Sequence, residues 1–238
     1  MHSEIETLKT WITESDNIVF FGGAGVSTES GIPDFRSTDG LYHQKFEYPP
    51  ETILSHTFFY QNPEYFFRFY REKMLPLDYQ PNEAHKKLAA LEQAGKLRAI
   101  VTQNIDGLHQ KAGSREVLEL HGSVLRNYCE KCGKFYGLET ILHSEGVPRC
   151  SCGGTVKPDV VLYEESLDED VMDRALRYIQ SADLLIIGGT SLVVYPAAGL
   201  VRYFRGRHLV VINKGETGGR VGADLTIDGP IGEVLSQV

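Results

Sequence analysis

Residues 22–37 read GGAGVSTESGIPDFRS and follow directly on the apolar run NIVFF. An apolar run that ends in closely spaced glycines is typical of the first turn of a Rossmann unit, where backbone N–H groups approach the phosphates of a dinucleotide. This stretch departs from that pattern, because the third glycine of GxGxxG is missing and Gly31-Ile32-Pro33 interrupts the helix that would follow. No Gly-Lys-Ser or Gly-Lys-Thr follows the glycines, so the stretch is not a P-loop. It predicts a nucleotide-binding loop of another shape.

Several apolar runs rich in β-branched residues each end in glycine or a small polar residue. They lie at 17–23, 97–104, 183–191, 208–215 and, more weakly, 223–229. Continuous rather than alternating apolarity indicates strands that are covered on both faces, as in a parallel sheet. Helical patterns at 83–95 and 168–183 lie between them and complete the alternation of a Rossmann-like α/β fold.

Two stretches do not follow this alternation. Residues about 36–80 are rich in Phe, Tyr and Pro and contain a helical pattern near 63–75, while residues about 126–160 hold short, turn-rich segments and all the cysteines. We expect both to be insertions that form a smaller helical and metal-binding lobe within one domain spanning 1–238. The larger, Rossmann-like lobe then comprises about 1–35, 81–125 and 161–238.

Composition limits the class of protein. With 42% hydrophobic and 24% charged residues the chain is an ordinary globular protein, and its formal net charge of −8 argues against a general nucleic-acid-binding protein. No apolar stretch reaches the ~18 residues of a membrane span, and the polar, amphipathic first residues do not resemble a signal peptide. We therefore expect a soluble, cytoplasmic protein.

The four cysteines form the pattern C-x₂-C-x₁₇-C-x-C, in the segments CEKCGK and RCSCGG. Their clustering in a chain without an export signal favours a metal over disulfides. The second pair is closer than usual, but residues i and i+2 of an extended strand point to the same side. We expect Cys129, Cys132, Cys150 and Cys152 to hold a structural zinc, with His143 as a conceivable substitute ligand. Four thiolates leave no open position for a substrate.

Small and polar residues follow four of the predicted strands. They lie at 23–28, 102–106, 189–191 and 213–215. Ligands of open α/β sheets bind outside the carboxyl ends of the strands, so we expect these four segments to line one nucleotide crevice.

With these segments the sequence resembles the sirtuin family. The resemblance rests on GAGVSTESGIPDFRS, TQNIDGLH, ELHGSV, the cysteine cluster, GTSLVVYPA and VINKGET, which occur in the family's order along nearly the whole chain. It implies a protein lysine deacylase that consumes NAD as a co-substrate. The acyl oxygen attacks C1′ of the nicotinamide ribose and expels nicotinamide, and the products are free lysine and O-acyl-ADP-ribose. The loop after the first strand would then carry side chains over the nicotinamide end, which explains the missing third glycine.

The resemblance also implies roles for single residues. His121 matches the general base and Asn104 the residue that positions the ribose and a water molecule. Asp106 would accept a hydrogen bond from the nicotinamide amide. The implied contacts with NAD are made by Ala24, Gly25, Thr28, Asp34, Phe35, Arg36, Gln103, Asn104, Ile105, Asp106, Gly189, Thr190, Ser191, Asn213, Lys214 and Ile227.

An acyl-lysine protein or peptide is the substrate that the resemblance implies. From the charge and hydropathy we expect no nucleic acid or membrane partner, and because the sequence shows no clear sign of an oligomer interface we expect a monomer. The peptide would add as a strand between 157–166 and the LVVYPA segment. Its implied contacts are Val160, Val161, Tyr163, Val193 and Tyr195. Glu164 stands where the family commonly has glycine, between an aromatic residue and glutamate.

Other functions remain open at this point. ADP-ribosyl transfer and NAD hydrolysis also begin with loss of nicotinamide, and a non-catalytic binding module is a third class. Desuccinylases of the family use a Tyr-x-x-Arg pair, which matches Tyr70 and Lys73 here. Lysine lacks the planar fork that binds a carboxylate through two hydrogen bonds, and Arg71 lies about 100° around the helix from Tyr70. We therefore expect preference for acetyl and other short neutral acyl groups.

Overall fold

The computed structural model describes residues 2–34, 40, 46–75, 78–215 and 222–238. Its main element is a six-stranded sheet of order β3-β2-β1-β7-β8-β9, in which every neighbouring pair is parallel. The strands are β1 (Ile18–Gly22), β2 (Leu97–Thr102), β3 (Val117–Glu119), β7 (Leu184–Gly188), β8 (His208–Asn213) and β9 (Leu225–Asp228). The order reverses at β1, which lies between β2 and β7. The predicted Rossmann-like parallel sheet is therefore confirmed.

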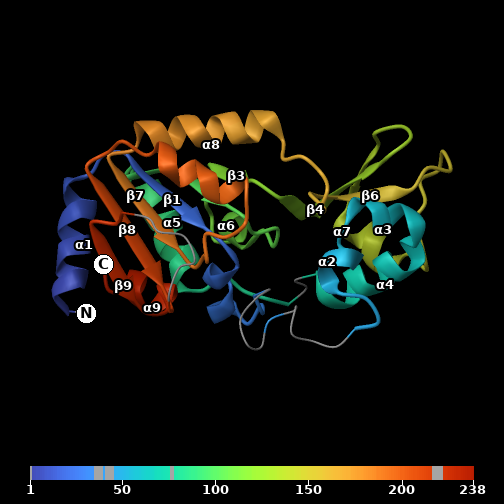
Figure 1. The fold of residues 1–238 in the computed structure, drawn as a ribbon, viewed down its shortest axis with the longest axis horizontal. Coiled ribbons are helices and arrows are strands. Elements are labelled where there is room, and N and C mark those ends of the chain that lie inside the picture. The colour runs from blue at the N-terminus through green and yellow to red at the C-terminus, as the bar shows by residue number, and fades with distance from the viewer. Residues whose placement is uncertain (1, 35–39, 41–45, 76–77, 216–221) are drawn as a thin grey trace.

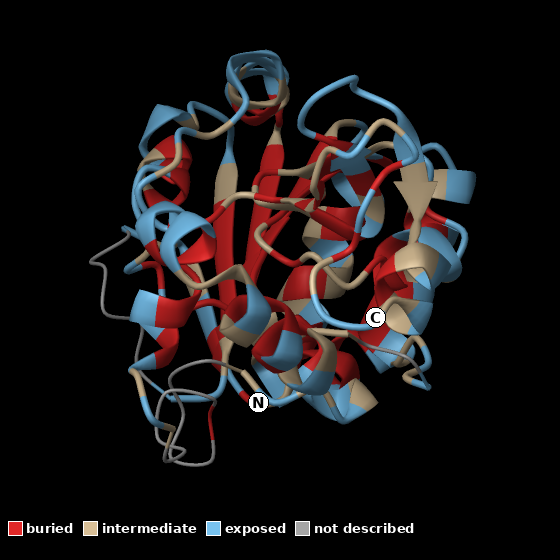
Figure 2. Ribbon diagram, turned by 90° about the vertical axis from the view of Figure 1, so that its right-hand side faces the viewer, coloured by how far each residue is buried: buried red, intermediate tan, exposed pale blue. Residues whose placement is uncertain are grey.

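Helices cover both faces of this sheet, which explains the continuous apolar runs. One core cluster contains Phe20 of β1 together with α1 (His2–Glu14), α5 (Glu83–Gln93) and α9 (Ile231–Ser236). The other contains Phe21 of β1 together with α8 (Glu169–Ser181) and the 3₁₀ segment η4 (Ala197–Tyr203). Consecutive strand residues thus serve opposite faces. Figure 1 shows α8 running along one face, and Figure 2 shows the strands buried beneath helices whose outer sides are exposed.

A second group of elements lies at the far end of the molecule from α1 (Figure 1). It contains the antiparallel sheet β5-β4-β6, formed by β4 (Gly122–Cys129), β5 (Phe135–Gly137) and β6 (Val156–Val160). Its helices are α2 (Pro50–Ile53), α3 (His56–Gln61), α4 (Pro63–Lys73) and α7 (Leu138–His143). Aromatic side chains of α3 and α4 build its separate core, together with Val124, Val156 and Leu162.

The lobe limits expected from the sequence stay a prediction. Strand β4 runs across the expected limit at residue 126 and leads from the large sheet into the small one. The short helix α6 (Leu108–Lys111) follows β2, and two single-turn 3₁₀ segments follow β1. No helix among the described residues is long and apolar enough to cross a membrane.

Candidate functional site

The ends of β1 and β7 approach each other so closely that both need glycine. The Gly25 N–H donates to the Gly189 carbonyl at 2.8 Å, and a Cβ on Gly25 would lie 2.8 Å from that oxygen. Gly189 has φ of +58°, and a Cβ there would lie 2.4 Å from the Val26 nitrogen. The first glycines of the loop therefore bring two strand ends together at the point where the strand order reverses, which is where such sheets bind ligands.

Between the end of β1 and Asp34, where the described stretch ends, the chain forms no regular helix, as the Gly-Ile-Pro sequence predicts. The chain forms two 3₁₀ turns, η1 (Ala24–Val26) and η2 (Thr28–Ser30), and then Gly31 takes φ of +93°. The Thr28 hydroxyl donates to the Gly25 carbonyl at 3.0 Å. The described chain continues to Asp34, whereas Phe35 and Arg36, for which we predict contacts at the nicotinamide end, lie outside the described residues.

Two residues that the sequence analysis does not assign anchor this loop. Both oxygens of the Glu29 carboxylate accept backbone N–H groups of α9, from Gly232 at 2.7 Å and from Glu233 at 3.2 Å. Asn82 caps α5 and donates its amide to the Val26 carbonyl at 2.7 Å. Asn82 could be recognised as a helix cap directly before the helical pattern. For Glu29 no sequence signal exists, because its partners lie about 200 positions away.

A buried hydrogen-bond network joins the loop to the end of β2. The Ser27 hydroxyl donates to Asp106 Oδ2 at 2.6 Å and accepts from the Asn104 amide at 3.1 Å, and the Leu108 N–H donates to Asp106 Oδ1 at 2.9 Å. Burial raises the pKa of the Asp106 carboxyl above its ordinary value, and these hydrogen bonds oppose the rise. The network brings together Asn104 and Asp106, which we predict to bind NAD, and adds Ser27 to them.

His121 lies in the turn between β3 and β4. Its Nδ1 is 3.0 Å from the Gln103 carbonyl, which can only accept, so Nδ1 carries the proton and the lone pair is on Nε2. Burial lowers the pKa of His121 below 6.5, although the hydrogen bond to Gln103 opposes this. At neutral pH the imidazole is therefore uncharged and in the tautomer of a general base.

This pKa predicts where the rate is lost at acid pH. A base accepts a proton only in its neutral form, so lowering the pKa keeps His121 active down to a lower pH. We expect kcat/KM for the deacylation that the resemblance implies to fall with decreasing pH around a midpoint below 6.5. A pH–rate profile measured at saturating NAD tests this, and a midpoint at pH 7 or above would contradict a buried, neutral His121.

The remaining predicted NAD contacts lie along the same edge of the sheet. The Gln103 amide donates to the Thr190 hydroxyl at 3.1 Å, so β2 and β7 are joined there, and Ser191 follows with an exposed side chain. Near the end of β8, the Asn213 amide donates to the Gly215 carbonyl at 3.2 Å and Lys214 is exposed.

Two predicted contacts lie in packed surroundings. Ile227 is 2% exposed and belongs to the core cluster on the α1 side of the sheet, and Ile105 packs against the core of the small sheet. The contacts of Ala24, which lies in η1, and of all these residues with NAD stay predictions.

The turn that carries His121 requires glycine at position 122. Gly122 has φ of +74°, and a Cβ there would lie 1.9 Å from the Asp159 carbonyl oxygen. Gly95 has a similar φ of +73°, but no atom of the described residues lies within 4 Å of its Cβ position. Strand β6 therefore lies against the backbone of the turn.

We expect Gly95→Ala to lower the free energy of unfolding by about 1–2 kcal/mol, the conformational cost alone. Gly122→Ala should lower it by more than about 4 kcal/mol, because the clash with β6 adds to that cost. Urea denaturation of both variants measures the difference. Equal losses would show that β6 does not restrict this turn.

The predicted substrate segment lies against the small lobe. Val160 ends β6 and is buried, and the Val161 N–H donates to the His121 carbonyl at 3.0 Å. Tyr163 pairs with Ser55 in an isolated parallel bridge, just before α3. Val193 and Tyr195, on the segment after β7, are 42% and 58% exposed, as side chains that meet a substrate should be. Their contacts with a peptide stay predictions.

The conformation and contacts of Glu164 show how glutamate is accommodated where the family commonly has glycine. It has φ of +76°, a conformation that favours glycine and costs other residues about 1–2 kcal/mol. Its Oε2 accepts the Thr57 N–H of α3 at 2.9 Å, a hydrogen bond that glycine cannot make and that offsets part of this cost.

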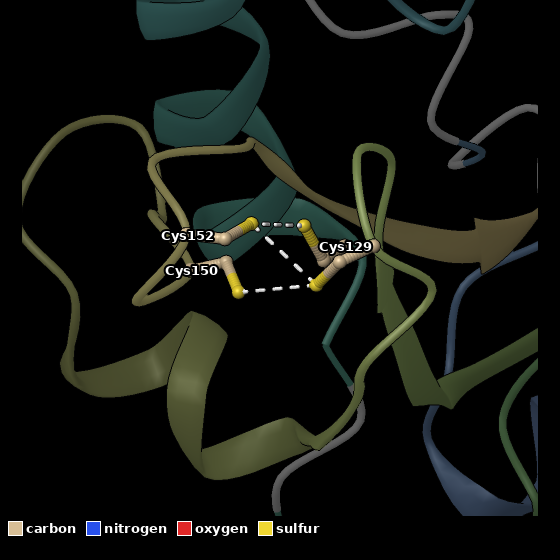
Figure 3. Close-up of side chains that lie close together, drawn as sticks. Cys129, Cys150 and Cys152 are labelled. Carbon is tan, nitrogen blue, oxygen red and sulfur yellow. Dashed lines mark hydrogen bonds between the residues drawn. The ribbon is translucent and has the colours of Figure 1, made fainter.

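The four cysteines come together as a candidate metal centre. Their Sγ atoms all lie within 4.8 Å of one another, and Figure 3 shows the thiols of Cys129, Cys150 and Cys152 pointing toward the same point. The close spacing of the second pair is therefore compatible with one ion. His143 is not part of the cluster, because its side chain is 78% exposed and lies 3.4 Å from Glu139.

Known proteins are similar to this chain in both sequence and fold. The family profile described as "Sir2 family" matches residues 23–196. A protein of Clostridium acetobutylicum named NAD-dependent protein deacetylase is 60% identical over an alignment of 239 positions that covers 99% of this chain and 98% of the relative. A structure of a Sir2 histidine-to-alanine variant with deacetylated p53 peptide and 3′-O-acetyl-ADP-ribose aligns with a TM-score of 0.90 at 40% identity, covering 98% and 96% of the two chains. A structure described as "Sir2-p53 peptide-NAD+" aligns with a TM-score of 0.86 at 41% identity, covering 98% of this chain and 96% of the other. The predicted family is confirmed: this chain belongs to the Sir2 family, the sirtuins.

Proposed function

We propose that this protein is an NAD-dependent protein lysine deacetylase, which transfers the acetyl group of a modified lysine to ADP-ribose and releases nicotinamide. The observation that carries the proposal is His121, a base of lowered pKa whose Nδ1 donates to the Gln103 carbonyl, one position before Asn104 of the Ser27–Asn104–Asp106 network. The curated relatives of the same length, which are named NAD-dependent protein deacetylases, support it.

The described residues fit NAD as a co-substrate. In the loop at 23–28, Gly25, Val26 and Ser27 already donate their N–H groups to backbone carbonyls, so the pyrophosphate would be bound by the N–H groups of the other loop residues, Ala24 and Thr28 among them. Asp106 keeps lone pairs beyond its bonds to Ser27 and Leu108, with which it would accept the N–H of the nicotinamide amide. Asn104 would orient the ribose.

His121 acts in the second half of this reaction. In the first half, the acetyl oxygen forms a bond to C1′ of the ribose and the bond from C1′ to nicotinamide breaks. Nε2 of His121 then takes the proton of a ribose hydroxyl as its oxygen attacks the acetyl carbon. Water then adds to the acetyl carbon, the lysine amine leaves with a proton, and the bond from the acetyl carbon to the oxygen on C1′ breaks, so the acetyl group stays on the ribose hydroxyl that attacked it. Proton transfer of this kind contributes about 10²–10⁴-fold in rate.

The four thiolates suit zinc, which prefers four sulfur ligands in structural sites. Cys129, Cys132, Cys150 and Cys152 would hold it between β4 and β6. With all four positions occupied by sulfur, the metal would stabilise the small lobe without taking part in the chemistry.

The first test is whether removal of the acetyl group requires NAD. We expect an acetyl-lysine peptide to lose the mass of its acetyl group when protein and NAD are both present, and to stay unchanged without NAD. ADP-ribosyl transfer, the second candidate, would instead add the mass of ADP-ribose to a protein or peptide, and NAD hydrolysis would proceed equally without the peptide. Either outcome with an intact acetyl-lysine would overturn the proposal.

We also propose that the enzyme acts as a cytoplasmic monomer on acyl-lysine proteins or peptides, with no nucleic acid or membrane as partner. Four free cysteines gathered for one metal are typical of a reducing compartment, and the net charge of −8 does not favour nucleic acid. Light scattering after size exclusion would test the oligomeric state.

The contacts of three residues on α4, Arg71, Lys73 and Tyr70, are relevant to which acyl group the enzyme removes. Arg71 donates to the Ile141 carbonyl, the Ser144 hydroxyl and the Gly146 carbonyl at 2.6–2.7 Å, so it ties α4 to the loop after α7. Lys73 lies 2.9 Å from Glu72. Tyr70 is fully buried and stacks on Phe66. The guanidinium that could bind an acidic acyl tail is thus already bound elsewhere.

We expect kcat/KM for an acetyl peptide to exceed that for the matched succinyl peptide by about tenfold or more, because a desolvated carboxylate without a partner is costly. The comparison is made at saturating NAD, with Lys73→Met as the control variant. Lys73→Met should leave the ratio unchanged. A tenfold preference for succinyl would contradict this account and make Lys73 the first residue to test.

A further inference from the structure

One guanidinium joins the large sheet to the small one. Arg126 lies in β4, and its Nη1 is 2.6 Å from Oε2 of Glu119, the last residue of β3. Its Nε is 2.8 Å from Oδ2 of Asp159 in β6. Arg126 therefore connects three strands, of which β3 belongs to the parallel sheet and β4 and β6 to the antiparallel sheet.

His121 lies inside the segment that this bridge closes. Glu119 precedes His121 by two positions and Arg126 follows it by five, so the ion pair ties together the two ends of the turn. The same turn is held by backbone bonds on both sides. Leu120 N–H donates to the Thr102 carbonyl at 2.9 Å, and the His121 carbonyl accepts the Val161 N–H at 3.0 Å.

The burial and geometry of the ion pair suit it to hold the turn that carries His121. The Glu119 side chain is only 7% exposed, so its charge depends on Arg126 for compensation. The planar guanidinium uses two different nitrogens for the two carboxylates, which fixes its orientation. The imidazole of His121 donates a hydrogen bond to the backbone carbonyl of Gln103, which directly follows β2. A shift of the turn relative to β2 would therefore change the position of Nε2.

We propose that Arg126 is a positioning residue for the general base: by holding Glu119 and Asp159 together it sets where His121 Nε2 lies relative to the bound ribose. The inference rests on the proposed function. Arg126 itself would not contact the substrate. Because His121 acts only after nicotinamide has left, loss of Arg126 should impair the second step of the reaction and spare the first.

The test compares these two steps in Arg126→Ala, Arg126→Lys and Arg174→Ala. Arg174 in α8 pairs with Glu116, just before β3, and serves as the matched control. Exchange of labelled nicotinamide into NAD reports the first step, and O-acetyl-ADP-ribose formation reports the second. We expect Arg126→Ala to keep exchange within about threefold while product formation falls by about tenfold to a hundredfold, as small misplacements of catalytic groups do. Arg126→Lys should restore part of the loss and Arg174→Ala should change neither rate.

A second variant keeps the test decisive if Arg126→Ala does not fold. Glu119→Gln combined with Arg126→Met removes the charges of the buried pair and keeps the side-chain volumes, so the only group of the bridge left charged is Asp159, whose side chain is 40% exposed. The proposal is overturned if product formation stays normal, or if exchange and product formation fall together in a folded variant. If the unaltered enzyme shows no deacetylation at all, the proposed function fails instead.

Discussion

Replacing His121 with alanine is expected to lower O-acetyl-ADP-ribose formation by about 10²–10⁴-fold while NAD still binds. The reason is that Nε2 carries the lone pair that accepts a proton, while Nδ1 only holds the ring against the Gln103 carbonyl. The hydrogen-bond network of Ser27, Asn104 and Asp106, which we propose binds NAD, does not include His121. Product formation is followed by mass spectrometry and NAD binding by calorimetry.

His143→Ala is the matched control for this prediction. His143 is exposed at the end of α7, lies outside the cysteine cluster and should be replaceable without effect on rate. Near-normal turnover of His121→Ala would remove the general-base assignment. Loss of NAD binding together with turnover would mean that the substitution disrupts the site and not only the proton transfer.

Removing the metal is expected to unfold the small lobe and to abolish activity indirectly. Zinc binding by thiolates in small domains is accompanied by a free energy of about 10–16 kcal/mol, and most of it appears as folding free energy. Cys129 and Cys150 are buried in the same core as the aromatic side chains of α3 and α4. The metal would join the end of β4 to the segment before β6, so we expect these segments to come apart when it is removed. Loss of near-UV circular dichroism and of turnover, measured after chelation, tests this.

Two controls accompany the zinc prediction. Adding zinc back under reducing conditions should restore both signals, which distinguishes metal loss from irreversible damage. Cys132→Ser should weaken zinc binding and, like removal of the metal, lower the melting temperature. A verified metal-free sample with unchanged melting temperature and unchanged rate would contradict a structural role.

The large sheet could be predicted from the sequence because its strands are buried on both faces. Continuous apolar runs marked β1, β2, β7, β8 and β9, each within a few residues of its observed bounds. Strand β3 has only three residues at the edge of the sheet, which is too short for a run to stand out. Helices α2 and α3 have four and six residues, and their buried side chains, among them Ile53 and Phe59, belong to a separate core that no periodicity reveals.

The candidate site was partly predictable for a similar reason. The carboxyl ends of parallel strands meet at one edge, so polar residues after β1, β2, β7 and β8 could be placed together. Individual partners could not be placed in this way. The hydrogen bond from Ser27 to Asp106 spans 79 positions, and the contact between Glu29 and α9 spans more than 200. Such pairs follow from the packing of loops and leave no local pattern in the sequence.

The central claim is that the acetyl group moves to ADP-ribose at the cost of one NAD per lysine. The most direct measurement uses a peptide whose lysine carries a ¹³C-labelled acetyl group, with all products identified by mass spectrometry. We predict one labelled O-acetyl-ADP-ribose and one nicotinamide for each deacetylated lysine. Labelled free acetate released without consumption of NAD, or ADP-ribose formed while the lysine keeps its acetyl group, would contradict the account.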